Sequence, residues 1–126
     1  MIIKQLFLVT ALFLIASCSS AQQYSSKNKK AIKLFEMGKS EPSNTIDERT
    51  HTPNFRGGLM YLNQAIEKDP SFWEAHMVAG EFCETLGDYR AAIDHYKKAL
   101  AINPQRNTTG SSYFFLANLE QAVGDY

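Results

Sequence analysis

The sequence predicts an all-α fold, a solenoid of stacked helical hairpins. Three observations predict it: a repeated pattern, residues that end helices at matching places in each repeat, and small residues where paired helices would cross. The period is 34 residues, as three pairs of positions show: Ala65 and Ala99, Pro70 and Pro104, and Asn54 and Asp88. A constant period of this length indicates stacked units that share one apolar core.

The composition excludes several other classes of protein. Lys and Arg total 13, and Asp and Glu also total 13, so the chain lacks the surplus of cations that nucleic-acid binding requires. Two Cys, at positions 18 and 83, are too few for a disulfide scaffold or a four-thiolate zinc site. We therefore expect a folded domain with no nucleic-acid partner, no metal and no cofactor.

Residues 1–17 predict a signal peptide. One cation, Lys4, precedes the apolar run from Leu6 to Ala16, which only Thr10 interrupts. A transmembrane helix needs about 20 apolar residues, so this run is too short to span a bilayer and has the length of a signal-peptide core.

The end of the apolar run, Ile15-Ala16-Ser17-Cys18, resembles a bacterial lipobox. The resemblance implies that Cys18 becomes the lipidated N-terminus, and two or more acyl chains attach a protein stably to a bilayer. Ser19 follows where Asp would imply retention at the inner membrane, so we expect an outer-membrane lipoprotein that faces the periplasm. The alternative is an ordinary signal peptide cleaved after Ala21.

Residues 18–30 predict a flexible tether, because they are polar and have no hydrophobic period. Lys27, Lys29 and Lys30 are near enough to the lipid to contact anionic headgroups. A solvated linker is the preferred interpretation. The folded domain is then expected to occupy residues 31–126.

The first unit, residues 31–70, is a degenerate repeat. Its first helix is expected at about 28–39, its second at about 56–68, and residues 40–53 form an inserted polar loop with two Pro. The apolar residues that define the two helices are Ala31, Ile32, Leu34, Phe35, Met37, Leu62 and Ala65.

The second unit, residues 71–105, is a full repeat with helices at about 72–85 and 88–101. Gly80 and Ala92 are small, so we expect the two helices to cross closely there. Three residues mark the helix ends: Gly87 suits a left-handed helix end, Asp88 suits an N-cap, and Pro104 stops the second helix.

The third unit, residues 110–126, is incomplete, with one helix expected at about 110–123. Its large apolar residues exceed what one neighbouring helix covers: Tyr113, Phe114, Phe115, Leu116, Leu119 and Val123. We expect a further helix, a second copy of the chain or a partner to cover them, so self-association through this helix is predicted. The alternative is that the helix is itself a solvating cap.

The segment from Trp73 to Gln105 resembles one tetratricopeptide repeat. The family's spacings are met by His76-x2-Ala79-Gly80-x2-Cys83, then Ala92-x3-Tyr96, then Pro104. The resemblance implies about two and a half such repeats in this chain. It also implies a concave groove lined by the first helix of each repeat, and a protein or peptide partner.

Carried over by position, the groove residues of the full repeat are Glu74, Met77, Glu81, Glu84 and Thr85, and those of the last unit are Ser111, Phe114, Asn118, Gln121 and Ala122. The family's clamp for an acidic C-terminus has Lys and Asn where this chain has Met77 and Glu81. An acidic, partly aromatic groove suits a basic or apolar peptide instead. A solvated charged face remains an equal alternative.

Three other residues are candidates for a catalytic or metal site. His76 and Cys83 are seven residues apart and share a helix face, which is compatible with a nucleophilic pair or a metal site. Both fall at packing positions, so core residues are the preferred interpretation. His95 is expected at the solvated surface. No catalytic residue and no metal ligand is predicted.

These observations predict a non-catalytic scaffold or adaptor for protein–protein interaction at the bacterial cell envelope. The leader and repeats resemble the N-terminal part of larger envelope proteins in which tetratricopeptide repeats precede β-propeller-like and OmpA-like domains, so the chain is expected to be a fragment of such a protein or a separate adaptor. The alternative function is a periplasmic, chaperone-like module that binds peptides.

Overall fold

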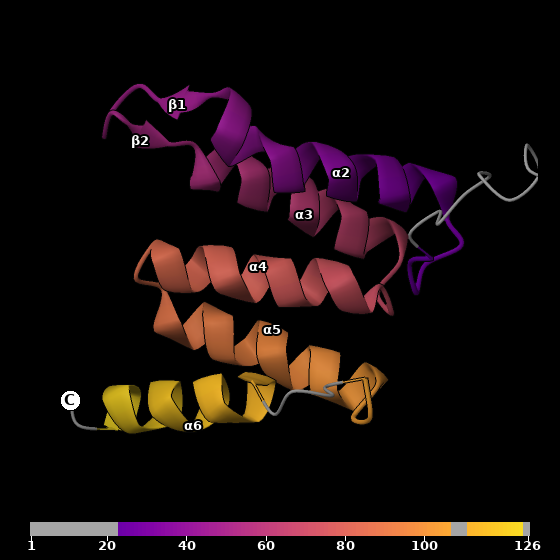
Figure 1. Cartoon of the computed structure of the whole chain (residues 1–126), viewed down its shortest axis with the longest axis vertical. Coiled ribbons are helices and arrows are strands. Elements are labelled where there is room, and N and C mark those ends of the chain that lie inside the picture. The colour runs from indigo at the N-terminus through magenta and orange to yellow at the C-terminus, as the bar shows by residue number, and fades with distance from the viewer. Residues whose placement is uncertain (1–22, 107–110, 125–126) are drawn as a thin grey trace, which may run out of the picture.

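The fold is an all-α solenoid in which each helix packs on the next. A computed structural model describes residues 23–106 and 111–124, apart from the side chains of 111, 112 and 114. The described helices are α2 (Lys29–Asn44), α3 (Phe55–Lys68), α4 (Trp73–Thr85), α5 (Tyr89–Ile102) and α6 (Ser111–Gly124), stacked in chain order (Figure 1). The predicted signal peptide and Cys18 lie outside the described residues.

Helices α3 to α6 agree with the expected ranges to within one residue at each end. None of the described helices is long and apolar enough to span a membrane.

The first hairpin, α2–α3, is held by two glycines at its crossing point. A Cβ on Gly58 would lie 2.7 Å from the carbonyl oxygen of Gly38 and 2.6 Å from the Phe82 ring. A Cβ on Gly38 would lie 2.8 Å from the carbonyl oxygen of Gly58. The two contacts between the glycines involve backbone oxygen atoms, so α2 and α3 approach this closely only because neither glycine has a side chain.

The second hairpin, α4–α5, crosses where the sequence predicted. A Cβ on Gly80 would lie 2.6 Å from the ring of Tyr96, and both Tyr96 and Ala92 are fully buried. Gly58 and Leu62 in the first hairpin occupy the places that Ala92 and Tyr96 take 34 residues later. The repeat therefore keeps its crossing geometry in both units.

The turn between α4 and α5 confirms the predicted roles of Gly87 and Asp88. Gly87 has φ +78°, in the left-handed region, its N–H donates to Glu84 O, and the N–H of Asp88 donates to Cys83 O. This pair of bonds is the Schellman arrangement that ends many helices. The Asp88 carboxylate then accepts from Ala91 N–H at 3.2 Å and caps α5.

The predicted loop at residues 40–53 is wrong over its first half, because α2 continues to Asn44. Pro42 lies inside the helix. It has no N–H to offer the carbonyl of Gly38 four residues earlier, and that oxygen lies against Gly58 where a side chain would otherwise stand. A proline near a helix end removes only one bond, so the helix tolerates it.

A short antiparallel hairpin fills the rest of this connection, with strands β1 (Ile46–Asp47) and β2 (Thr52–Pro53). Asp47 organises it by accepting from Arg49 N–H at 2.9 Å and by lying 3.8 Å from the Nε atoms of Arg49 and Arg56. These contacts lower the pKa of Asp47, chiefly through the Arg49 backbone bond.

The core has two apolar clusters. The first joins α2, α3 and α4 around Phe35, Leu62 and Phe72. The second joins α4, α5 and α6 and consists of Cys83, Ala92, Tyr96 and Leu119. Helix α6 contributes Leu116 and Leu119 to it, while Tyr113 and Phe115 remain 53% and 39% exposed.

Candidate binding surface

Residues 24–28, here called the strap, pack against the body of the protein. The ring of Tyr24 lies edge-on to the rings of Phe35 and Phe72, at centroid distances of 5.2 and 5.9 Å. Its hydroxyl donates to the carboxylate of Glu36. The prediction of a flexible tether over residues 18–30 is therefore wrong from Tyr24 onward, because an aromatic ring that packs edge-on against two core rings is held in place.

The strap also caps helix α4. Phe72 occupies the N-cap position of α4 and has no side-chain oxygen to accept from the first N–H groups. Ser25 provides that oxygen from 48 residues away, since its hydroxyl accepts from Trp73 N–H at 3.0 Å. The same hydroxyl donates to Glu74, and Ser25 N–H donates to Glu74 Oε1 at 3.0 Å. The start of α4 thus depends on the strap.

Ser26 and Asn28 complete the strap. Ser26 is 3% exposed and its hydroxyl donates to Asp69. This bond is the main reason that the pKa of Asp69 lies below its ordinary value. The Asn28 side chain caps α2 by accepting from Lys30 and Ala31 N–H, and its amide donates to Lys68 O at 3.1 Å. The strap consequently ties α2, the end of α3 and the start of α4 together.

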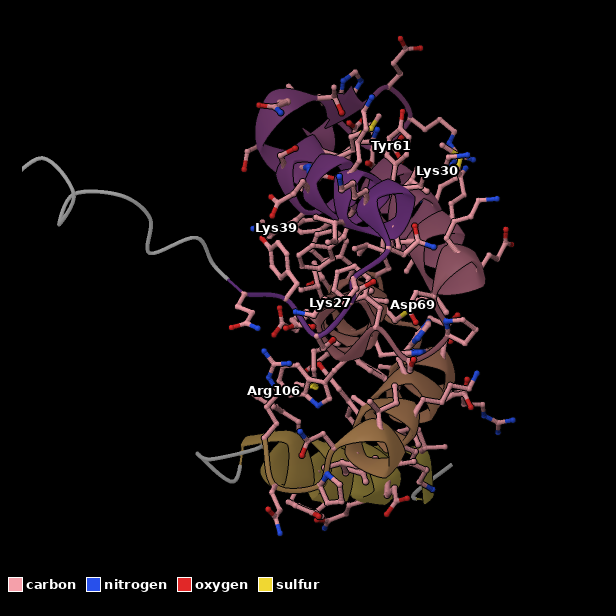
Figure 2. All side chains as sticks on the ribbon, turned by 90° about the vertical axis from the view of Figure 1, so that its right-hand side faces the viewer. Lys27, Lys30, Lys39, Tyr61, Asp69 and Arg106 are labelled. Carbon is pink, nitrogen blue, oxygen red and sulfur yellow. The ribbon has the colours of Figure 1, made fainter. Side chains whose placement is uncertain are left out.

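Arg106 closes over the same site from the connection after α5. Its Nη2 atom lies 2.6 Å from Glu74 Oε1, and its guanidinium lies 5.0 Å from the centre of the Trp73 ring. Figure 2 shows Arg106, Lys27 and Asp69 on the side of the stack that faces the viewer. Glu74, the first predicted groove residue, is only 12% exposed. It is held by Ser25 and Arg106, and it is not open to a ligand.

The other predicted groove residues of α4 differ in availability. Met77 is partly buried against the second core cluster. Glu84 accepts a hydrogen bond from the buried Tyr96 hydroxyl at 3.1 Å. Burial, and then the charge of Glu84, raise the pKa of Tyr96. Thr85 is exposed, with its hydroxyl donating to Glu81 O at 2.9 Å.

Glu81 is the carboxylate that α4 presents to solvent. Its side chain is exposed and forms no ion pair within the described residues. Partial desolvation raises its pKa, and the neighbouring charge of Glu84 raises it further. A cation that approaches Glu81 would relieve both effects, which suits a basic ligand.

Helix α6 contributes Asn118, Gln121 and Ala122, all exposed. The predicted groove residues Ser111 and Phe114 lie on α6, but their side chains fall outside the described residues. The side-chain surface that the structure describes for the predicted groove is therefore Glu81 and Thr85 on α4 and the polar residues of α6.

His76 and Cys83 are core residues in this structure, with exposures of 3% and 1%. Burial raises the pKa of the Cys83 thiol to about 11, so the thiol stays protonated at neutral pH and is a poor nucleophile. No group of three or more potential metal ligands is found among residues 23–106 and 111–124.

The prediction that His95 lies at the solvated surface is wrong. His95 is half-buried, with its Nδ1 3.3 Å from His76 Nδ1. His76 Nε2 lies 2.9 Å from Pro70 O, which can only accept, so His76 Nε2 carries the proton and His76 Nδ1 accepts from His95. Burial is the main cause that lowers the pKa of both imidazoles.

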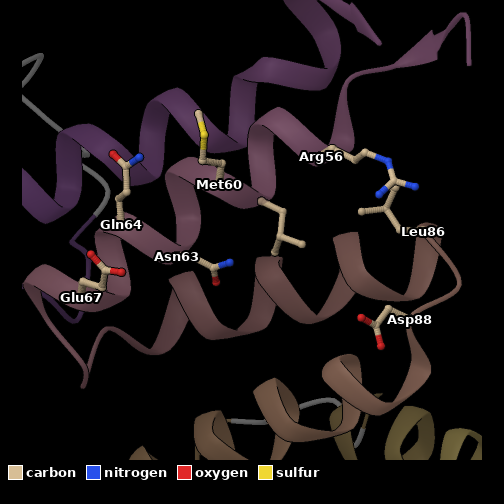
Figure 3. A pocket seen from close by; sticks show the side chains of 8 residues that line it. Arg56, Met60, Asn63, Gln64, Glu67, Leu86 and Asp88 are labelled. Carbon is tan, nitrogen blue, oxygen red and sulfur yellow. The ribbon is translucent and has the colours of Figure 1, made fainter. Parts of the chain in front are cut away.

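Sequence reasoning missed a hollow on the side of α3 away from the strap. It measures about 570 Å³ and lies between α3 and the turn that joins α4 to α5 (Figure 3). Its lining is mixed, with Leu59 and Met60 beside Arg56, Glu67 and Asp88. The exposed Met60 was the available sequence signal, because an apolar residue on the outer stripe of a predicted helix is unexpected.

Comparison with known proteins identifies the repeat. No curated protein matches the chain. Residues 73–106 match the family model of the tetratricopeptide repeat, and this segment contains α4, the Gly87 turn and α5. The match supports a tetratricopeptide-repeat protein, and repeats of this family are modules for protein–protein interaction.

Proposed function

We propose that this chain is a non-catalytic scaffold for protein–protein interaction at the bacterial cell envelope, anchored through a lipid on Cys18 to the outer membrane and facing the periplasm. The face of α4 and α6 is the binding surface. The observation that carries the proposal is Glu81, an exposed carboxylate on α4 without an ion pair in the described part of the chain. On α6, the amides of Asn118 and Gln121 are exposed as well.

The partner class follows from the charges on that surface. Glu74 is neutralised by Arg106 at 2.6 Å, so it contributes little net charge to the groove. Glu81 and Glu84 remain, and partial burial, followed by the charge of Glu84, raises the pKa of Glu81. A basic segment with apolar side chains fits best, since the cation binds the carboxylates while apolar groups contact the half-buried Met77.

Peptide binding tests this surface. The probe is a labelled peptide of alternating Lys and Leu, with a Glu–Leu peptide of equal length as the control ligand. Glu81→Gln should weaken binding of the Lys–Leu peptide about two- to fivefold, as expected for loss of one exposed charge pair. The matched control variant is Glu67→Gln, on α3 in the hollow of Figure 3. Equal affinities for the two variants would refute the proposed surface.

The anchor is tested separately. Cys18→Ser should move the protein from the membrane fraction to the aqueous fraction, and the wild-type N-terminal peptide should carry acyl chains by mass spectrometry. A variant that stays membrane-bound beside an unlipidated wild type would remove the lipid anchor from the proposal.

Self-association through α6 is a further part of the proposal, supported by the exposure of Tyr113 and Phe115. It is measured by light scattering.

A further inference from the structure

The positive charges of this protein are unevenly paired. Six Lys and Arg side chains in the described part of the chain lie within ion-pair distance of carboxylates: Lys39, Arg49, Arg56, Lys97, Lys98 and Arg106. Six others are exposed and have no such partner. Two of these, Lys68 and Arg90, lie apart in the sequence, and four lie within seven residues of one another: Lys27, Lys29, Lys30 and Lys33. We refer to these four residues as the lysine cluster.

Helix stability does not account for the lysine cluster. Lys29 and Lys30 lie in the first turn of α2, which contains no acidic residue. The N-terminus of a helix carries a partial positive charge, so cations are unfavourable there. Lys29 and Lys33 are also four residues apart on one helix, a spacing at which like charges repel. An arrangement that disfavours the helix on both counts indicates a role outside folding.

The strap fixes the lysine cluster on the folded body. Lys27 lies between Ser26, bonded to Asp69, and Asn28, which caps α2 and bonds Lys68 O. Figure 2 shows Lys27 and Lys30 on the side of the stack that faces the viewer. The other two, Lys29 and Lys33, lie with Lys30 in the first five residues of α2, so the four charges are gathered where that helix begins.

The distance to the anchor is short. Six Cα–Cα steps separate Cys18 from Tyr24, the first residue of the strap. Fully extended, they span at most about 20 Å. If Cys18 is lipidated, as proposed above, the lysine cluster is held within reach of the headgroups, where the surface potential falls off over a Debye length of about 8 Å.

We propose that Lys27, Lys29, Lys30 and Lys33 form a contact surface for anionic phospholipid, which turns the strap side of the solenoid toward the bilayer. The lipid on Cys18 determines that the protein is at a membrane, and the lysine cluster determines which side of it faces that membrane. This inference rests on the proposed anchor for its setting, but the charge contact itself acts without the lipid.

The test uses the chain from residue 18 with Cys18→Ser, so that no acyl chain contributes. Binding is measured by vesicle flotation, with vesicles of phosphatidylcholine alone and of phosphatidylcholine with phosphatidylglycerol. The cluster variant replaces all four lysines by Gln. The matched control removes four cations from other elements: Arg49→Gln, Arg90→Gln, Lys97→Gln and Lys98→Gln. Circular dichroism establishes that both variants keep their helices.

The unsubstituted chain should bind the anionic vesicles, bind the neutral ones far more weakly, and dissociate as salt is added. The cluster variant should bind about 600-fold more weakly, because each of the four lysines near an anionic surface strengthens binding by roughly fivefold. The control variant should bind within about threefold of the unsubstituted chain, because its charges lie outside the cluster.

Three results would overturn the inference: no preference for anionic vesicles, equal losses in the cluster and control variants, or tighter binding to a nucleic-acid duplex than to anionic vesicles. None of these results bears on the proposed function. The fate of Cys18→Ser in membrane fractions and the effect of Glu81→Gln on peptide binding are measured independently of the four lysines.

Discussion

The first hairpin, α2–α3, and the second, α4–α5, have the same crossing and different ends. Gly58 and Leu62 in the first correspond to Ala92 and Tyr96 in the second, and each set lies fully or almost fully buried at the crossing. The second hairpin turns at Gly87, whereas the first turns through a proline-containing helix end and a two-stranded hairpin. The packed interior tolerates few changes and the connection tolerates many, because only the interior is close-packed.

The two hairpins also differ in how their first helices begin. Helix α2 is capped by its own Asn28, but α4 begins at Phe72 and is capped by Ser25 from the strap. The second unit therefore relies on residues that precede the first unit. The strap is therefore part of the fold. The predictions below compare what the two hairpins contribute to the free energy of unfolding.

The largest expected effects come from the equivalent buried side chains. Tyr96→Ala should lower the free energy of unfolding by about 3–5 kcal/mol, and Leu62→Ala by about 2–5 kcal/mol, since both leave cavities in a close-packed core. Tyr96 and Leu62 are each 0% exposed. Urea unfolding followed by circular dichroism measures both. A cost below about 1 kcal/mol at either position would show that its hairpin is loosely packed.

Adding one methyl group at the crossings is the next test. Gly58→Ala and Gly80→Ala should each destabilise by about 1–3 kcal/mol through overpacking. Gly58→Ala should cost more, because its Cβ meets the backbone oxygen of Gly38 at 2.7 Å, whereas the Cβ of Gly80→Ala meets a side-chain ring at 2.6 Å. Gly124→Ala, with nothing within 4 Å, is the control. The reverse order of costs would contradict the view that the first crossing is the tighter one.

Removing the strap's cap tests the dependence of α4 on the start of the chain. Ser25→Ala should lower the free energy of unfolding by about 1 kcal/mol, the usual cost of losing an N-cap oxygen. Ser43→Ala, an exposed position in α2, is the matched control. Amide exchange should become faster in the first turn of α4 but not in α2. Unchanged exchange at Trp73 and Glu74 would mean that the strap does not cap α4.

As the pH falls, the contacts of the second hairpin should lose stability at a higher pH than the contacts of the strap. The pKa values of His76 and His95 lie below the ordinary value of 6.5 in the folded protein, so the unfolded chain takes up protons first as the pH falls. Their contribution to stability is full above pH 6.5 and is lost as the pH falls below it. The lowered pKa of Asp69 acts only below its ordinary value of 3.8.

Urea unfolding at a series of pH values measures this dependence. His95→Gln should flatten the fall in stability between neutral pH and about pH 5. Asp69→Asn should instead flatten the fall at lower pH. Identical pH profiles for His95→Gln and the wild type would show that the imidazole pair does not couple to folding.

The smallest effect is expected where α6 meets α5. Lys97 Nζ lies 2.7 Å from Glu120 Oε1, but both side chains are about half exposed. Lys97→Met should therefore change the free energy of unfolding by less than about 1 kcal/mol, and the change should shrink in high salt. A larger, salt-independent loss would mean that this pair fixes α6 on the second hairpin more firmly than its exposure suggests.

The helices of the second hairpin were predictable because their signals are local. Gly87, Asp88 and Pro104 act on their immediate neighbours, and Gly80 and Ala92 recur at the spacings of the repeat. The candidate surface was predictable in part for the same reason, since a 3.6-residue period places Glu81 and Thr85 on one side of α4. The availability of its carboxylates could not be predicted, since no local signal indicates that Arg106, in the connection after α5, neutralises Glu74 at the start of α4.

The sequence by itself therefore determined the repeat, the helix ends of the second hairpin and the close approach of its two helices. The tertiary structure alone decided that α2 passes through Pro42, that His95 meets His76, and that the strap caps α4. Ser25 and Trp73 are 48 residues apart, and no local preference of a serine specifies which distant N–H it will accept. Local signals act along the chain, while these contacts exist only once the helices have packed, and so they follow from the fold.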